Sequence, residues 1–218
     1  MALTPEQAEQ HVILKILAGS HVHGLNVLES DRDEDAIVIE PITSAVVLGK
    51  PWEDTVVETP ERDVKYVSLR KWCGLACRGN PNFLLMLFAP QSHILKMNAL
   101  GGQLRDMREM FISKQAIKSH LGYMQGQRQR MLNQIACHED VGKNGGHGKP
   151  RHDLYEKYGY DTKFAMHLLR LGLQGCELAM FGKLTLPLQE EHRTNLLNVR
   201  AGNLPLEYVL GYAEELET

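Results

Sequence analysis

The sequence predicts an α+β fold, with a short mixed β-sheet in the N-terminal half and mainly α-helices in the C-terminal half. As far as residue 90, short apolar segments alternate with turn-rich stretches that contain glycine and proline. From residue 93 onward, apolar residues repeat with helical spacing and clusters of β-branched residues become rare. We therefore expect an α/β domain over residues 1–90 and a helical domain over residues 91–218.

The composition is ordinary for a globular protein, with 43% hydrophobic and 23% charged residues in a chain of 218. The longest apolar run, 83–89, is far shorter than the roughly 20 residues that cross a bilayer. The first ten residues lack the basic and apolar regions of a signal peptide, and four scattered cysteines suggest reduced thiols. We expect no membrane association and a cytoplasmic location. A net charge of −3 means that a nucleic-acid partner would need a local basic surface.

The N-terminal half opens with a helix, because Thr4 can serve as its N-cap and Pro5 fits its first position. This helix is expected to run into the first strand. A turn-rich passage over residues 43–62 separates the second strand from the third, which leads into a helix ending near Arg78. The apolar segment Val12–Leu17 is expected to hold the end of the N-terminal helix and to run into the first strand, and the second and third strands are expected at Ala36–Ile39 and Asp63–Ser68.

The C-terminal half is expected to consist of helices around one loop. Ile117, Leu121 and Met124 form an apolar stripe at helical spacing. Residues 138–153 are rich in glycine and lack apolar periodicity, which indicates a loop. Further helices are expected at 162–181, 190–200 and 205–216, and Gly182 stands where a helix C-terminus belongs.

The stretch GSHVHGLNVLESDRDED, residues 19–35, carries the candidate site. The Gly19-Ser20 turn offers backbone N–H groups and a hydroxyl with little steric bulk, which suits a phosphate. Asp31 and Asp33 would share one face of an extended strand, about 6.6 Å apart, and such a pair suits Mg²⁺. A phosphate turn next to paired carboxylates is typical of nucleotidyl transfer. The alternative is a solvated acidic turn.

This arrangement resembles the signature of the nucleotidyltransferase superfamily that includes DNA polymerase beta. It is most similar to the predicted nucleotidyltransferases found beside RNA ligases, chiefly in bacteria and phages. Four further blocks in the same order carry this resemblance, which runs from about residue 12 to about residue 210: DVKYVSLRKW, GNPNFLLMLF, YGYDTKFAMHLLRL and GKLTLPL.

The resemblance implies roles for individual residues. Asp31 and Asp33 would bind two divalent metal ions, Mg²⁺ or Mn²⁺, and Gly19 and Ser20 would contact the phosphates of an NTP. A third carboxylate usually lies on a neighbouring strand, where it binds a metal or takes the proton from the acceptor hydroxyl, and Asp63 is the candidate. Glu40 and Glu61 are weaker alternatives for that third position.

Several positions depart from the family pattern. His21 and His23 stand where a basic and an aromatic residue are common, and Arg32 stands between the aspartates where an apolar residue is usual. Leu85 replaces a frequent glutamate, so any catalytic role of that carboxylate is missing here.

Lys163, His167 and Arg170 are spaced as one face of a helix. Their charge could bracket a triphosphate where the pyrophosphate leaves. The alternative is a solvated helix face with a histidine bonded to a backbone carbonyl. The resemblance favours the nucleotide-binding role for Lys163 and Arg170.

We therefore predict a metal-dependent nucleotidyltransferase that moves NMP from an NTP to a hydroxyl acceptor, with an RNA end as the acceptor suggested by the family. Two alternatives belong to other classes. The first is a catalytically silent nucleotide-binding regulatory module, which the missing carboxylate at Leu85 would favour. The second is an RNA-binding helical protein that uses the basic residues after residue 105, for which salt-dependent RNA binding without metal would be diagnostic.

Overall fold

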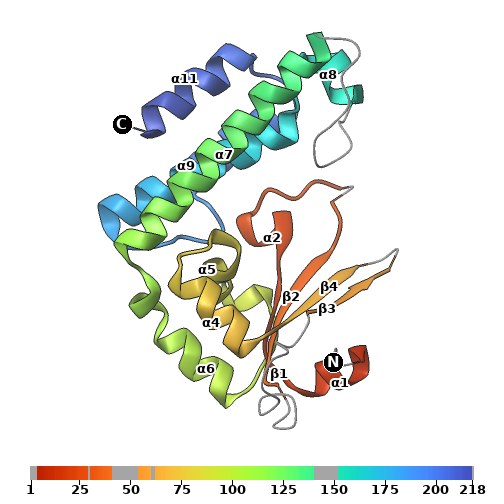
Figure 1. Ribbon diagram of the computed structural model, residues 1–218, viewed down its shortest axis with the longest axis vertical. Helices are drawn as coiled ribbons and strands as arrows, with labels where there is room; N and C mark the ends of the chain where they lie inside the picture. The colour runs from red at the N-terminus through yellow and green to blue at the C-terminus, as the bar shows by residue number, and fades with distance from the viewer. Residues whose placement is uncertain (1–3, 29, 41–53, 60–61, 140–151, 218) are drawn as a thin grey trace. The chain divides into compact units, whose positions relative to one another are not determined.

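The computed structural model describes residues 4–28, 30–40, 54–59, 62–139 and 152–217. The fold is α+β, as predicted, with a mixed β-sheet followed by a set of α-helices (Figure 1). The chain divides into two compact units. The first comprises Met1–Ala116 and Lys183–Gln189, and the second comprises Ile117–Gly182 and Glu190–Thr218.

In the described part of the chain, a five-stranded sheet forms the centre of the first unit, with the strand order β3-β4-β2-β1-β5. Strands β2 and β4 are parallel, whereas the other neighbouring pairs are antiparallel. This confirms the predicted mixed sheet. The strands are β1 (Val12–Leu17), β2 (Asp33–Val38), β3 (Thr55–Glu58), β4 (Asp63–Ser68) and β5 (Ile94–Met97).

Strand β4 begins and ends as predicted. Strand β1 takes up all of Val12–Leu17, where we expected the end of the first helix as well, because that helix already ends at Gln10. Strand β2 begins three residues earlier than predicted, at Asp33, and ends one residue earlier, at Val38. Strands β3 and β5 were not predicted, because they fall in the turn-rich passage and in the region expected to be helical. Both are short edge strands, and most of their residues are at least partly exposed. Their pairing with the inner strands, rather than an apolar run, defines them.

Helices cover both faces of the sheet. Ala8 of α1 packs against one face, together with Val12, Ala36, Val38, Val64 and Tyr66. On the other face, Lys65 of β4 lies over the ring of Phe83 in α5, with its Nζ 5.2 Å from the ring centre. The helices of this unit are α1 (Pro5–Gln10), α2 (Gly19–His23), α4 (Leu69–Cys77), α5 (Pro81–Phe88) and α6 (Ala99–Asp106), with short 3-10 turns at Gln91–His93 and Arg108–Phe111.

The α/β unit extends past the boundary expected near residue 90. Strand β5 follows that position and pairs with the inner strand β1, and α6 packs against β1 as well. The segment Lys183–Gln189 also joins this unit, where the Leu188 N–H donates to the His23 carbonyl at 3.2 Å. The unit therefore ends at Ala116 and takes in a second, later piece of chain.

The second unit consists of helices in the part of the chain that the structure describes. The bounds of α9 match the prediction, because the Asp161 carboxylate caps its first turn and Gly182, in the left-handed region at φ 59°, ends it. The predicted inward leucines of α9, Leu168, Leu171 and Leu178, are buried. Most of the predicted loop lies outside the described residues. The helices are α7 (Lys114–Glu139, which begins in the first unit), α8 (His152–Tyr158), α9 (Thr162–Phe181), α10 (Glu190–Arg200) and α11 (Leu206–Glu217).

Across the described residues, we find no helix with both the length and the apolar character needed to span a membrane.

Candidate active site

Gly19 and Asp33 are in direct contact at one end of the sheet. Gly19 begins α2 with a φ of 57°, in the left-handed region that glycine adopts readily. A Cβ added to Gly19 would collide with the carboxylate of Asp33. The Ala18 N–H donates to the Asp33 carbonyl at 2.8 Å, which joins the two segments. The predicted phosphate turn and one predicted metal ligand are therefore neighbours, with no space for a larger residue at position 19.

Side chains alternate along β2, and their contacts show which face each one takes. Arg32 Nε lies 3.0 Å from Glu34 Oε1, so these two side chains share one face. Asp33 and Asp35 consequently point to the opposite face. Asp31 is exposed and lies just before the strand. The expectation that Asp31 and Asp33 share a face of one strand therefore remains a prediction.

Asp63 lies where a third carboxylate was expected. It is the register partner of Asp33 in the parallel pair β2–β4, and Lys65 is the partner of Asp35. Aligned positions of neighbouring strands project to the same face. Of the two weaker alternatives, Glu40 follows the far end of β2, and Glu61 lies outside the described residues.

Asp35 is a carboxylate of this face that our sequence analysis missed. Burial, together with the nearby charge of Asp33, raises the pKa of Asp35 to about 6 despite the opposing effect of Lys65. The alternation of aspartates at 31, 33 and 35 is the sequence signal that could have identified it. A cation between Asp33 and Asp35 would reduce the repulsion between their like charges.

The carboxylates predicted as metal ligands offer oxygen donors, which are the donors that Mg²⁺ prefers. In the residues described, no three His, Cys, Asp or Glu side chains are grouped as a ready-made metal site. Mg²⁺ does not require such a group, because it commonly uses one or two carboxylates and completes its shell with water and substrate phosphates. Asp31 and Asp33 are the residues that would hold it.

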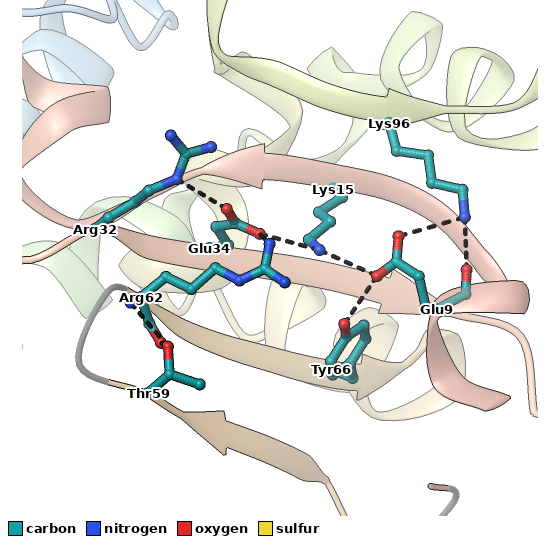
Figure 2. A network of polar contacts seen from close by, with 8 residues as sticks. All are labelled: Glu9, Lys15, Arg32, Glu34, Thr59, Arg62, Tyr66 and Lys96. Atoms are coloured by element: carbon teal, nitrogen blue, oxygen red, sulfur yellow. Dashed lines mark hydrogen bonds and ion pairs between the residues drawn. The ribbon is translucent and has the colours of Figure 1, made fainter. Parts of the chain in front are cut away.

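The opposite face of the sheet carries a connected network of charges (Figure 2). Lys15 Nζ lies 3.0 Å from both Glu9 Oε2 and Glu34 Oε2, and the Tyr66 hydroxyl donates to Glu9 at 2.8 Å. Burial alone would raise the pKa of Glu34, but hydrogen bonds from Lys15 and Arg32 outweigh it and lower the pKa. Burial alone would lower the pKa of Lys15, but its two glutamates raise it. Both partners therefore stay ionised although their side chains are only 7% and 2% exposed.

Two of the positions that depart from the family pattern are buried. His23 is 5% exposed, and its carbonyl accepts the hydrogen bond from Leu188. Leu85 is also buried, within the apolar helix α5. A carboxylate at position 85 would be removed from water, so the leucine serves as core packing here.

The remaining predicted residues belong to the second unit. Lys163 and His167 are partly buried on α9, and the Lys163 N–H donates to Asp161. Arg170 is buried, donates from Nη1 to Gln174 Oε1 at 3.2 Å, and has a pKa lowered by burial to about 10. Their contact with a nucleotide remains a prediction.

The comparison with family models agrees with the resemblance. Residues 1–208 match the family model described as the RNA repair pathway DNA polymerase beta family. No curated protein matches the chain. Among solved structures, it is similar to a nucleotidyltransferase-like protein from Exiguobacterium sibiricum 255-15, with 12% identity, a TM-score of 0.40, and coverage of 97% of this chain and 70% of that one. That likeness is too distant to assign a role to any residue here.

Proposed function

Because the chain belongs to the RNA repair pathway DNA polymerase beta family, we propose that it is a divalent-metal-dependent nucleotidyltransferase that adds NMP from an NTP to the end of an RNA. The observation that carries this proposal is the contact between Gly19 and the Asp33 carboxylate, with Asp63 in register beside Asp33. It brings a turn suited to phosphate and two carboxylates to one end of the sheet.

The free cysteines Cys73, Cys77 and Cys176 are compatible with the expected cytoplasmic location.

In the proposed reaction, the acceptor hydroxyl oxygen attacks the α-phosphorus of the NTP. The bond from the α-phosphorus to its bridging oxygen breaks, and pyrophosphate leaves. Gly19 and Ser20 hold the distal phosphates through backbone N–H groups and the serine hydroxyl. Asp63 takes the proton that the acceptor hydroxyl loses.

Asp31 and Asp33 would hold Mg²⁺ or Mn²⁺, which supplies charge stabilisation for the phosphates and lowers the pKa of the attacking hydroxyl. Lys163, His167 and Arg170 are proposed as further contacts to the triphosphate.

The proposal is tested by NTP binding with and without Mg²⁺ or Mn²⁺, using the wild type, Asp31→Ala/Asp33→Ala, and Asp153→Ala as a matched control. Asp153 is an exposed aspartate of α8. Incubation with α-labelled NTPs and mixed RNA runs in parallel. We expect metal-dependent binding and labelling of RNA that the double variant loses and the control keeps. Absence of metal-dependent NTP binding would refute the proposal.

The two alternatives give different results in the same experiment. The buried Leu85 is the observation that favours a silent nucleotide-binding module, for which binding would persist without label on any acceptor. An RNA-binding protein without transferase activity would bind RNA in the absence of metal and would not bind NTP.

A further inference from the structure

Arg32 and Arg62 occupy matching positions, each immediately before one of the two parallel strands β2 and β4. Each precedes one of the paired aspartates, Asp33 and Asp63, and the Asp63 N–H donates to the Arg32 carbonyl at 2.9 Å. Both guanidinium groups approach the same carboxylate, Glu34, at 3.0 Å and 3.7 Å, and Figure 2 shows them reaching it from neighbouring strands.

Glu34 is buried and held in place, whereas the two arginines that bind it are exposed to solvent. The Glu34 side chain is 2% exposed and is bound by the buried Lys15, so it forms a fixed anchor. The two arginine side chains are 51% and 52% exposed. Arg32 contacts Glu34 through Nε and Arg62 through Nη1. Since a guanidinium has five N–H donors, each arginine retains donors for a second, solvent-side acceptor.

The charge of the network calls for an anionic partner. Among the described residues, the ion pairs of this network join four cations, Lys15, Arg32, Arg62 and Lys96, to two carboxylates, Glu9 and Glu34, so the network itself has a formal excess of two positive charges. The whole chain, by contrast, has a net charge of −3. Of the cations of this network, Arg32 and Arg62 have the most exposed side chains, and arginine suits phosphate through its planar fork.

The position of the arginines favours a polyanion other than the NTP. Arg32 and Glu34 project to the face of β2 opposite to Asp33, whose carboxylate contacts Gly19. The NTP phosphates are assigned to the Gly19 side, so a phosphate on the arginine side belongs to another part of the reacting complex. We propose that Arg32 and Arg62 bind backbone phosphates of the acceptor RNA strand. This inference rests on the proposed function and adds the residues that hold its acceptor.

The test is the salt dependence of RNA binding, measured by the anisotropy of a fluorescein-labelled single-stranded RNA of mixed sequence. The variants are Arg32→Ala, Arg62→Ala and the double variant. Arg193→Ala is the control, because Arg193 also pairs with one carboxylate, Glu190, at 2.8 Å. Binding of NTP with Mg²⁺ is measured on the same samples. The fold should survive, since Glu34 keeps its ion pair with Lys15.

We expect each single variant to bind RNA roughly three- to ten-fold more weakly at low salt, and the slope of log affinity against log salt to shrink by about 0.7 for each lost contact. Arg193→Ala and NTP binding should not change. Arg32→Lys/Arg62→Lys keeps the charge and should recover most of the slope, which covers the case in which the alanine variants misfold.

Two results would overturn the inference. One is that the slope of log RNA affinity against log salt stays unchanged in the double alanine variant and also in the lysine variant. The other is loss of NTP affinity with unaltered RNA binding, which would assign the arginines to the triphosphate. Failure of the proposed function would give a different result, because the wild type would then show no metal-dependent NTP binding. The salt dependence of RNA binding would still show whether Arg32 and Arg62 bind RNA phosphates.

Discussion

Gly19 combines a backbone requirement with a steric one, and both concern the proposed site. Its φ of 57° disfavours any residue with a Cβ, and the space that a Cβ would need is filled by the Asp33 carboxylate. Gly19→Ala should therefore destabilise the protein by about 1–3 kcal/mol and displace Asp33, with loss of metal-dependent NTP binding. Thermal unfolding and NTP titration measure the two effects.

The matched control is Gly74→Ala. Gly74 lies inside α4, and a Cβ there would meet no atom within 4 Å. Since alanine favours helix over glycine, this variant should be as stable as the wild type or more stable by about 0.5–1 kcal/mol. Equal behaviour of the two variants would contradict the steric argument for Gly19.

Asp35 predicts a pH dependence of stability. Because its pKa is raised from 3.8 to about 6 in the folded protein, ionisation of Asp35 costs stability as the pH rises through that range. Asp35→Asn removes the cost, so the variant should be more stable than the wild type at pH 7.5, by about 1–3 kcal/mol. The difference should vanish near pH 4. Urea unfolding at both pH values measures it, and a difference independent of pH would rule out this origin.

At the residue scale, the sequence was informative where a motif was present. The spacing of Gly19, Ser20, Asp31 and Asp33 led to the region in which the structure brings Gly19 and Asp33 together. Asp35 and the role of Arg32 at Glu34 were missed, because burial and pairing across strands depend on register, which one sequence does not reveal.

At the element scale, the buried network on β1 and β2 makes strand pairing sensitive to charge. Lys15→Met would leave Glu34 and Glu9 without their shared buried cation, and should destabilise the protein by about 2–4 kcal/mol. Lys15→Met/Glu34→Met should cost less than Lys15→Met alone, since an apolar pair needs no counter-charge. Chemical denaturation of these two variants and of Glu34→Met tests this, and additive losses would show that the two residues act independently.

Elements with local signals were predicted with their bounds, as α9 shows. Its capping Asp161, its buried leucines and its terminal Gly182 are all local features of the sequence. Strand β3 pairs with β4, which follows it closely in the sequence, but it escaped prediction because its four residues lie in a turn-rich passage and form no apolar run. Strand β5 escaped prediction because only its pairing with the distant strand β1 defines it. The same dependence explains why β2 starts at Asp33: its charged first residues follow the ladder with β4 rather than an apolar pattern.

At the scale of the whole molecule, ligand binding should appear as stability. A ligand that binds only the folded state at 100 times its Kd adds about 2.7 kcal/mol. Saturating NTP with Mg²⁺ should therefore raise the Tm of the wild type by several degrees. Asp31→Ala/Asp33→Ala should show no such rise, and Asp153→Ala should match the wild type. An equal rise with NTP in the presence of a chelator would argue against a metal-dependent site.

The fold class was predictable because it follows from the order of short strands and long helices. The extent of the first unit was not, since Lys183–Gln189 joins it from far along the chain. Nothing in that short segment's composition indicates its partner, and only the assembled chain brings Leu188 to His23.

The position of Lys183–Gln189 late in the sequence affects the folding of the first unit during synthesis. The helices of 117–182 must be synthesised between the two pieces of the first unit, a delay of 189 − 116 = 73 residues. At roughly 5–20 residues per second, the ribosome needs on the order of 4–15 seconds to cover that distance. During this interval, the carbonyl of His23 cannot form its bond to Leu188. The nascent α/β unit therefore lacks this hydrogen bond until residues 183–189 have been synthesised.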